Sequence, residues 1–436
     1  MKRCHLFSLI VFLFSGCLGV LAQNATKTYN LQDVLQQIIE NNPTLKQAKG
    51  KQDLYTSKID LAKQHKYPKI FLEGSFAYVD PISEVSLPLG KTPVTLPLFP
   101  NDNWDVHAGI QYTLYDFGRA NTIINIAKIE KLIADEGLIA AQKKLTYAAT
   151  ELYHSILFTK NAITVQDKLI ASLNRNLLRT DGFIANGLAT RFDRINTNVQ
   201  ITAAKNRKTH LENSLHKLKQ HLKGLMGIDT NVVLKITGEI QIENLMVKST
   251  SFEEGQQNAL AITKYIDSIL GQSEKLANKG NLPIVTIGGT TGYQNGYMPD
   301  LDEFRFNNAV FAKVTLPIFQ GFKVKHEKEI AAIKRANNNW HIEEVKTEID
   351  TKLSIAKTAL ENAISQYENS KILIVQAETA VEQARKRYEN QLITNLDLLD
   401  TEVAYSKAQL VLLESEYKCT LAHYKLQQAK GIKIWE

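Results

Sequence analysis

The chain has 436 residues, of which 44% are hydrophobic and 22% charged, and its formal net charge is +7. This basic excess is mild and no block rich in lysine and arginine occurs, so the sequence argues against nucleic-acid binding. The prolines fall in three places: at Pro43, between Pro68 and Pro100, and between Pro283 and Pro317. Because proline breaks helices, the long proline-free tracts favour uninterrupted helices.

Residues 1–22 have the pattern of a secretory signal peptide, with two basic residues, an apolar stretch and small residues that end at Ala22. Cleavage after Ala22 removes two positive charges and leaves a mature net charge of 7 − 2 = +5. An alternative interpretation takes Cys17 as the lipidated cysteine of a lipoprotein signal. After cleavage at Ala22 the mature chain keeps only Cys419, which cannot form an internal disulfide and which we expect to be buried in a helix.

The sequence repeats itself at an offset of about 204 residues, with three anchors in the same order and no net gap between them. The anchors are 112–119 over 316–323, 188–193 over 392–397, and 227–228 over 431–432. Such a repeat predicts two units with one layout. We expect a first repeat over 23–230 with a helix, a strand pair, a long helix and a return helix. A connector over 231–252 in an equatorial region leads to the second repeat over 253–436.

One segment alternates strictly between apolar and polar residues for about ten positions, as the strands of a membrane β-barrel do. Its apolar set is predicted to face lipid and comprises Trp104, Val106, Ala108, Ile110, Tyr112 and Leu114. Alternation predicts three more strands, at 70–78, 285–293 and 310–318. A soluble sheet with one wet face is the alternative, but four strands separated by long helical tracts would make a poor soluble core.

The sequence restricts how this chain could cross a membrane. No stretch after residue 22 has 18 or more consecutive apolar residues, so we predict no transmembrane helix. Only helices and closed barrels satisfy every backbone polar group in lipid. Since about eight strands are the usual minimum for a barrel, four strands need partners from other copies of the chain. Three copies would supply twelve strands.

A heptad seam runs through the second repeat, with alternating steps of three and four residues between its members. The seam consists of Leu353, Ala356, Leu360, Ala363, Tyr367, Ser370, Ile374, Ala377, Val381, Ala384 and Tyr388. This period predicts a coiled coil, and its small residues permit close helix approach. In the first repeat a helix over 119–179 would be roughly 90 Å long.

A proline-rich segment over 80–103 joins the first two predicted strands, and the topology predicts that it is a long loop on the outward side. A loop of roughly two dozen residues is unusual in a compact protein. Two interpretations stay open: a segment that covers a pore mouth, and a plain solvated loop.

The sequence lacks the motifs that carry catalysis or hold a metal. It has no His-Glu-x-x-His, no glycine-rich phosphate loop and no cysteine pair. His210, His216 and His221 are not spaced four residues apart, and we expect them on a helix surface. We therefore predict no enzyme activity, no cofactor and no metal site.

Several short motifs occur in a characteristic order along the chain. They are 31–35 with 40–46 in the first helix, 115–119 and 316–321 at strand-to-helix junctions, and 187–193 and 392–400 at two turns between long helices. In this order and with the repeat, the sequence resembles the TolC-type outer membrane efflux protein family. The resemblance covers nearly all of the mature chain, although no single motif is highly specific.

The resemblance implies a mainly α-helical protein with a transmembrane β part, built as a homotrimer. Its twelve-stranded barrel in the outer membrane would continue into a long coiled-coil barrel of helices in the periplasm. The function implied is the exit duct of a tripartite efflux or type I secretion system. The partners implied are a periplasmic adaptor protein, an inner-membrane pump and outer-membrane lipid. A periplasmic coiled-coil scaffold without a pore is the alternative, against which the four amphipathic strands argue.

Four residues match the periplasmic gate of the family: Tyr388, Asp193, Asp397 and Asp400. By this resemblance Tyr388 contacts Asp193 and ties one helix pair to its neighbour, while the other two aspartates line the entrance. Three copies would place six carboxylates around a narrow opening, which favours cations. Asp193 and Asp397 also fit plain helix capping after a turn, and both roles can hold.

The two turns between the long helices match the adaptor contacts of the family. They consist of Gly187, Leu188, Ala189 and Thr190 in the first turn, and Gln391, Leu392, Ile393 and Thr394 in the second. Gln391 stands where the first turn has glycine, so the two tips are not equivalent. Ile393 stands where several members carry an arginine that locks the entrance. The closed state is therefore expected to be held less tightly, or by other residues.

Overall fold

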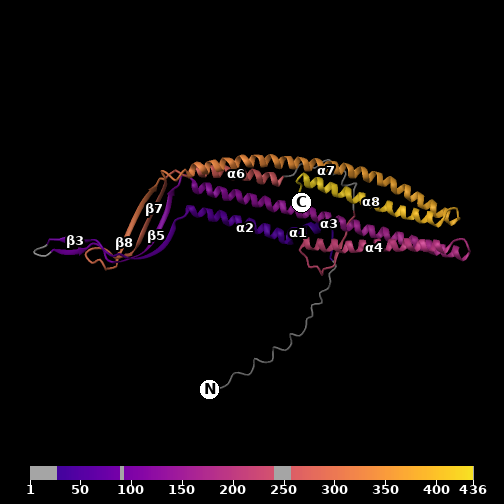
Figure 1. Cartoon of the computed structure of the whole chain (residues 1–436), viewed down its shortest axis with the longest axis horizontal. Helices are drawn as coiled ribbons and strands as arrows, with labels where there is room; N and C mark the ends of the chain where they lie inside the picture. Colours follow the sequence, from indigo (N-terminus) through magenta and orange to yellow (C-terminus); the bar gives the residue numbers. More distant parts are fainter. Residues whose placement is uncertain (1–26, 89–92, 240–256, 436) are drawn as a thin grey trace, which may run out of the picture.

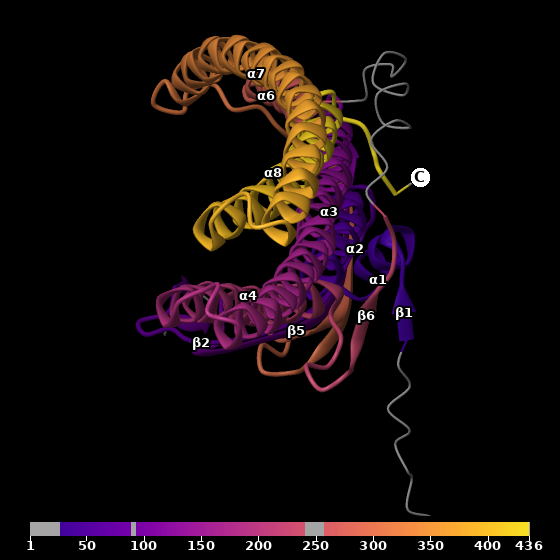
Figure 2. The same ribbon diagram turned by 90° about the vertical axis from the view of Figure 1, so that its right-hand side faces the viewer.

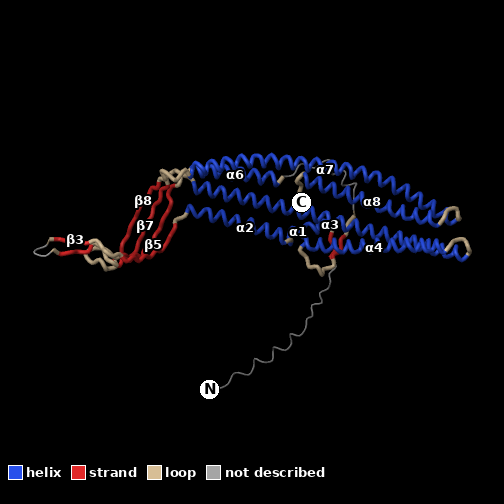
Figure 3. Tube along the Cα trace, in the orientation of Figure 1, coloured by secondary structure: helices blue, strands red, loops and turns tan. Residues whose placement is uncertain are grey.

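The computed structural model describes residues 27–88, 93–239 and 257–435. The molecule is long and narrow, with a small β-sheet toward one end and helices that run from it to the other end (Figure 1). The main sheet and the long helices occupy separate parts of the length, and a short strand pair lies beside the middle of the helices (Figure 3). The predicted signal peptide over 1–22 and the predicted lipidation site at Cys17 lie outside the described residues, as do residues 240–252 of the predicted connector.

Two long helices and two return helices make most of the length. These are α3 (Arg119–Ala185), α4 (Arg191–Met226), α7 (Lys323–Glu389) and α8 (Asn395–Ala429). Helices α3 and α7 have 67 residues each, which corresponds to roughly 100 Å. Helix α7 starts 323 − 119 = 204 residues after α3, and α8 starts 395 − 191 = 204 residues after α4. Helix α3 continues past the predicted end at 179, because the chain first turns back at Gly187.

Shorter helices flank the sheet and the middle of the molecule. They are α1 (Leu31–Asn41), α2 (Pro43–Lys63), the single 3₁₀ turn η1 (Gln64–Lys66) and α6 (Asn258–Asn278). Asn30 begins α1 because its side chain accepts from the amide of Asp33, whose carboxylate in turn accepts from the amide of Asn30. Pro43 stands at the first position of α2, where a missing N–H costs nothing.

Four antiparallel strands form the main sheet in the order β2-β5-β7-β8. Their bounds are Lys69–Tyr78 for β2, Asp102–Tyr115 for β5, Ile284–Gln294 for β7 and Arg305–Thr315 for β8. Two small ribbons complete the strands: β1 (Lys27–Tyr29) pairs in parallel with β6 (Leu234–Ile236), and β3 (Glu84–Leu87) pairs antiparallel with β4 (Val94–Pro97).

Two sequence predictions about the strands need correction. The last strand was expected over 310–318 but spans Arg305–Thr315, because Pro317 has no N–H for the ladder and the alternation starts further upstream. The segment over 80–103 was expected to be a loop, and it contains the β3–β4 ribbon. Strands β2 and β7 agree with the predicted 70–78 and 285–293 to within one residue at each end.

Helices and strands together form one curved layer. Near the sheet the neighbouring helices follow the order α2, α3, α6, α7, and nearer the other end the order α4, α3, α8, α7. Viewed along the long axis, the helices lie on an arc with an open concave side (Figure 2). The layer is open at two edges along its length. Elements β2, α2 and α4 stand at one edge, and β8 and α7 stand at the other.

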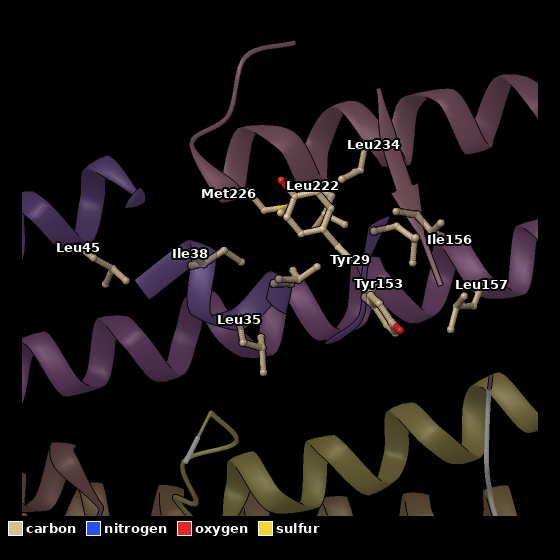
Figure 4. Packing of buried hydrophobic residues seen from close by; sticks show 13 residues of the cluster. Tyr29, Leu35, Ile38, Leu45, Tyr153, Ile156, Leu157, Leu222, Met226 and Leu234 are labelled. Atoms are coloured by element: carbon tan, nitrogen blue, oxygen red, sulfur yellow. The ribbon is translucent and has the colours of Figure 1, made fainter. Parts of the chain in front are cut away.

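The largest hydrophobic core lies midway along the helices, where α1, α3, α4 and the β1–β6 pair meet (Figure 4). Its fully buried members include Leu35 and Ile38 of α1, Ile156 of α3 and Leu222 of α4. Since one buried leucine or isoleucine contributes about 1.5–3 kcal/mol, this cluster holds the N-terminal segment on the long helices.

The heptad seam is confirmed as the buried face of α7. From residue 353 onward, every buried residue of α7 belongs to the predicted seam: Ala356, Leu360, Ala363, Ser370, Val381, Ala384 and Tyr388. Ala356, Leu360 and Ala363 pack on α8 against Cys419, Ala422 and Leu426. Cys419 is buried, as predicted.

Candidate functional site at the helical tips

Two turns form the end of the molecule that lies farthest from the sheet, one after α3 and one after α7 (Figure 1). Gly187 in the first turn and Gln391 in the second have positive φ values of 68° and 57°. In both turns the next amide N–H donates to a helix carbonyl five positions earlier, at 2.8 Å. The two turns thus close with the same helix C-terminal motif, although only one of them uses glycine.

The residues predicted to contact an adaptor make up these two turns. Leu188 and Leu392 are their exposed apolar side chains, with 57% and 72% of the surface accessible. Thr190 and Thr394 start the return helices as N-cap residues. Ile393 turns inward instead and packs with Tyr388, Leu398 and Ala384. The tips therefore present Leu188 and Leu392 to solvent, together with Phe192 and Leu396 at the starts of the return helices.

Asp193 and Asp397 take part in capping boxes at the starts of α4 and α8. The Asp193 carboxylate accepts from the amide and the hydroxyl of Thr190, at 2.8 and 2.7 Å. The Asp397 carboxylate accepts from Thr394 in the same way, at 3.0 and 2.7 Å. These hydrogen bonds to its charged form lower the pKa of Asp397. The capping role that the sequence allowed for both aspartates is therefore present.

Tyr388 is buried between the two helix pairs, with 4% of its surface exposed. Its ring meets Phe183 of α3 edge-to-face at 5.6 Å, and its hydroxyl lies 3.2 Å from the Thr180 hydroxyl. Tyr388 thus ties α7 to α3, but its hydroxyl bonds Thr180 rather than the expected Asp193. Burial raises the pKa of Tyr388, and the negative charge of Asp193 raises it further.

Asp400 differs from the two capping aspartates. Its side chain is exposed on the first turns of α8 and has no hydrogen-bond or ion-pair partner among the described residues. A carboxylate without such partners can interact directly with an ion that passes nearby. Of the four predicted gate residues, Asp400 is the one that no local structural role explains.

A buried asparagine pair joins α8 to the first helix pair. Asn176 of α3 donates to the Asn395 side chain at 2.9 Å. Asn395 in turn donates to the backbone carbonyl of Asp193 at 3.1 Å and lies 3.2 Å from the Thr197 hydroxyl. Both amides are almost completely buried, so these bonds fix the position of α8 against α3 and α4.

An ion pair with a buried carboxylate and a half-buried arginine lies one to two turns further from the tip. The Arg385 guanidinium of α7 bonds both carboxylate oxygens of Glu402 of α8, at 2.7 and 2.9 Å. Ser172 of α3 donates to the same carboxylate at 2.9 Å. The Glu402 side chain is 5% exposed, and its hydrogen bonds raise the pKa of Arg385. Three helices thus meet at one carboxylate.

At the other end, the strands of the main sheet share one apolar face. The cross-strand register places Ile70 opposite Ile110, Phe76 opposite Trp104, and Tyr293 between Val106 and Phe306. The face includes Ile70, Leu72, Phe76 and Tyr78 of β2, Trp104, Val106, Ala108, Ile110 and Tyr112 of β5, Ile287 and Tyr293 of β7, and Phe306, Val310 and Val314 of β8.

The other face of the sheet is mainly polar, with Phe71 and Phe311 lying over Gly109 and Gly288, and the predicted alternation ends at a bulge. His107 on the polar face lies 3.0 Å from Asp105 and 3.8 Å from Glu73. Leu114, the last residue predicted on the apolar face, stands at a register shift after which Tyr115 pairs with β7. The apolar face is exposed in the single chain.

Two further properties concern only the described part of the chain. No helix within it is long and apolar enough to span a membrane. No cluster of three or more histidine, cysteine, aspartate or glutamate side chains in it is arranged to hold a metal ion. His210, His216 and His221 are exposed on α4, as predicted.

A family model described as outer membrane efflux protein matches residues 34–228 and 270–431, which is well over half of the chain. The chain belongs to the outer membrane efflux protein family. It is therefore an outer membrane protein, and the family consists of channels rather than enzymes.

Solved outer membrane proteins share the fold of this efflux protein. VceC from Vibrio cholerae superposes with a TM-score of 0.75 at 18% identity, over 93% of this chain and 97% of its own. CmeC from Campylobacter jejuni has a TM-score of 0.73 at 14% identity, over 92% of this chain and 85% of its own. MtrE from Neisseria gonorrhoeae, solved in an open state, superposes with a TM-score of 0.72 at 16% identity, over 92% of this chain and 89% of its own. No curated protein matches the chain in sequence.

The sequence missed the residues that hold the helix pairs of this efflux protein together. Glu402 and Asn395 are polar residues on the buried side of α8, and neither belongs to a recognisable motif. One signal was present. Ser172, Asn176, Thr180 and Phe183 follow steps of four, four and three along α3, which places them on one helix face. A polar stripe at this spacing on a long helix indicates a specific polar contact.

Proposed function

We propose that this chain forms the outer-membrane exit duct of a tripartite efflux or type I secretion system. In this function three copies enclose one channel, which conducts substrates passively when an adaptor and an inner-membrane pump are docked. The observation that carries the proposal is the four-stranded sheet, which is apolar on one face, polar on the other and open at both edges. Such a sheet satisfies its backbone in lipid only within a closed barrel.

A head-to-tail ring of copies pairs the two open edges of the layer. Helix α2 leads through η1 into the edge strand β2, and the edge strand β8 leads into α7. The sheet and the helical part are therefore open on the same two sides. One edge of a copy then meets the opposite edge of the next, which closes a ring if the rotation allows. Three copies give twelve strands, above the usual minimum for a barrel.

Aromatic side chains at the sheet's two ends support its placement across a membrane. At the end far from the helices, the ring centroids of Phe76 and Trp104 are 4.4 Å apart, and those of Tyr293 and Phe306 are 5.5 Å apart. At the other end Phe319 packs edge-to-face on Phe322. Aromatic belts at both interfaces are typical of outer-membrane barrels. The apolar set from Trp104 to Tyr112 faces lipid in this arrangement.

The two helix pairs arise from an internal duplication in this proposal. The first repeat spans 23–230 and the second 253–436, joined by the connector over 231–252. Equal lengths of α3 and α7 and the constant offset of 204 residues support it. The family model also matches in two segments, one inside each repeat.

The tips form the periplasmic gate and the adaptor contact. In the closed state Tyr388 and Glu402 hold the second helix pair on α3, and Asp400 of each copy faces the entrance. Asp193 and Asp397 stabilise the turns that present Leu188 and Leu392 to the adaptor. Ile393 packs on Tyr388 where an arginine would otherwise stand, so the lock in this chain is placed further up, at Arg385 and Glu402.

Single-channel conductance of protein extracted from outer membranes tests this proposal. We expect a cation-selective conductance from the wild type. Asp400→Asn should reduce the selectivity, because it removes one free charge per copy. Asp397→Ala with Asp400→Ala should reduce it further. Glu348→Gln changes an exposed carboxylate of α7 that is remote from the tips, and should leave the selectivity unchanged.

Two results would count against parts of the proposal. If assembled wild-type protein shows no conductance, the chain is not a duct, and a coiled-coil scaffold becomes the better account. If Asp400→Asn and Glu348→Gln behave alike, the channel stands but the acidic entrance does not.

A further inference from the structure

The β3–β4 ribbon extends beyond the outer end of the main sheet (Figure 1), and its register gives it one entirely apolar face. The register pairs Val85 with Leu96 and Leu87 with Val94, which places these four side chains together. The opposite face carries Glu84, Pro97 and a contact of 3.2 Å between the hydroxyls of Ser86 and Thr95. Alternation this strict indicates a ribbon with one face against apolar groups and one in water.

The ribbon is a continuation of the main sheet. Beyond the last pair of β2 and β5, the Val79 amide donates to the Asn101 carbonyl at 2.9 Å, and the Asn101 side chain donates back to the Val79 carbonyl at 3.0 Å. The Leu98 amide then donates to the Ser83 carbonyl at 2.9 Å. The apolar face is therefore held in a defined place above the edge strand β2.

The four apolar side chains stay 37–44% exposed in the single chain. A two-stranded ribbon is at best marginally stable in water by itself, and exposed apolar faces mark contact sites. Because the ribbon continues the β2–β5 pair and β2 is the open edge strand, the ring proposed above brings the β8 edge of the next copy beside it. That edge carries the β7–β8 loop over 295–304 at the same end of the sheet.

The β7–β8 loop presents a matching apolar surface. Tyr297, Met298 and Phe304 are exposed there. The loop is fixed because the buried Asn295 side chain accepts from the Trp104 amide at 2.7 Å and donates to the Asp102 carbonyl at 2.6 Å. Arg305 donates to the Met298 carbonyl at 2.9 Å. Both surfaces are thus preformed.

We propose that the apolar face of each β3–β4 ribbon packs on the β7–β8 loop of the neighbouring copy, against Tyr297, Met298 and Phe304. This contact links adjacent copies at the outer mouth of the duct, beyond the membrane. It rests on the proposed ring of copies. The β3–β4 ribbon is then neither a solvated loop nor a free lid, but part of the interface between copies.

Paired cysteines tested with a short bismaleimide in isolated outer membranes check this contact. Leu87→Cys with Phe304→Cys should give bands of two and three joined chains on a denaturing gel. The matched control is Ser86→Cys with Phe304→Cys, one residue away on the polar face, which should cross-link several-fold less. Val94→Cys with Phe304→Cys is a second test pair. Cys419 is buried and away from both surfaces.

Each other outcome overturns the proposal. Equal cross-linking from Leu87→Cys and Ser86→Cys would mean that the ribbon has no preferred face. Cross-linking of Leu87→Cys alone would mean that ribbons contact one another instead. No cross-linking from either test pair in an assembled oligomer would leave lipid or solvent as the occupant. The mass of uncross-linked wild-type protein separates these cases from failure of the ring itself.

Discussion

Gln391 holds a left-handed backbone conformation at the second helical tip, where the first tip has Gly187. A side chain costs about 1–2 kcal/mol in that region, and glycine loses about 0.5–1 kcal/mol more in conformational entropy on folding. We therefore expect Gln391→Gly to stabilise the protein slightly, and Gly187→Ala to destabilise it. A Cβ added at Gly187 would meet no other atom within 4 Å, so Gly187→Ala tests the backbone conformation without a steric clash. Thermal unfolding of both variants measures the effect, and shifts of the same sign would contradict it.

His154 makes the stability of the helical part depend on pH. The imidazole is buried between Tyr153 and Tyr424, neither ring nitrogen has a hydrogen-bond partner among the described residues, and burial lowers its pKa from 6.5 to about 4. Between these values the unfolded chain binds a proton that the folded chain does not. Stability is therefore lost as the pH falls from 6.5 to 4, by about 1.4 kcal/mol per pH unit.

The variant His154→Phe should remove this pH dependence, and unfolding followed between pH 7 and pH 4 measures it. His216→Phe, on the exposed face of α4, should retain the wild-type slope. An unchanged slope in His154→Phe would mean that another group titrates in this range.

Single residues show how far sequence reasoning reaches. The seam residues of α7 were predictable because burial repeats at a regular period. The turns at Gly187 and Gln391 were predictable because the repeat aligns them. The partners of Tyr388 and Arg385 were not predictable. Thr180 and Glu402 come from other helices, and which residues meet across two helices depends on the rotation and crossing angle of those helices.

At the scale of single elements, β5 offers a direct test of the lipid-facing assignment. Ile110 and Gln111 are neighbours at nearly the same depth and lie on opposite faces of the sheet. An arginine on the lipid face of a barrel costs about 2–4 kcal/mol near the midplane. Ile110→Arg should therefore reduce the amount of assembled protein in outer membranes, whereas Gln111→Arg should be tolerated. Equal amounts of both variants would exclude the assignment.

Helix α8 allows a matched comparison of a buried and an exposed carboxylate. Glu402→Gln weakens the hydrogen bonds that join α7, α8 and α3, and a hydrogen bond to a charged group contributes about 1.5–3 kcal/mol. Glu414→Gln removes only a surface pair with Lys418, of about 0–1 kcal/mol. We expect Glu402→Gln to open the channel more often in planar bilayers. If Glu414→Gln has the same effect, the buried pair is not the lock.

Elements differed in how well the sequence predicted them. The long helices were predictable from proline-free tracts, and the predicted end of α3 at residue 179 fell short by a few residues because a helix end depends on the turn that follows. The β3–β4 ribbon was missed because prolines dominate 80–103, and proline usually signals a loop. Its alternation at 84–87 and 94–97 was nevertheless present in the sequence.

At the scale of the whole molecule, a single chain leaves its sheet edges unpaired and its apolar sheet face exposed. Its layer of helices and strands is curved and open at two edges (Figure 2). In the proposed ring, the gate charges, the outer ribbon and the barrel all depend on contacts between copies. The sequence alone indicated this need, because four strands cannot close on themselves.

The proposed ring of three copies is tested most directly by native mass spectrometry, which measures the mass of the complex extracted from outer membranes in mild detergent. We expect a species with three mature chains, stable without any partner protein. A stable single chain, or an assembly of two or four, would contradict the ring of three copies and the twelve-stranded duct with it.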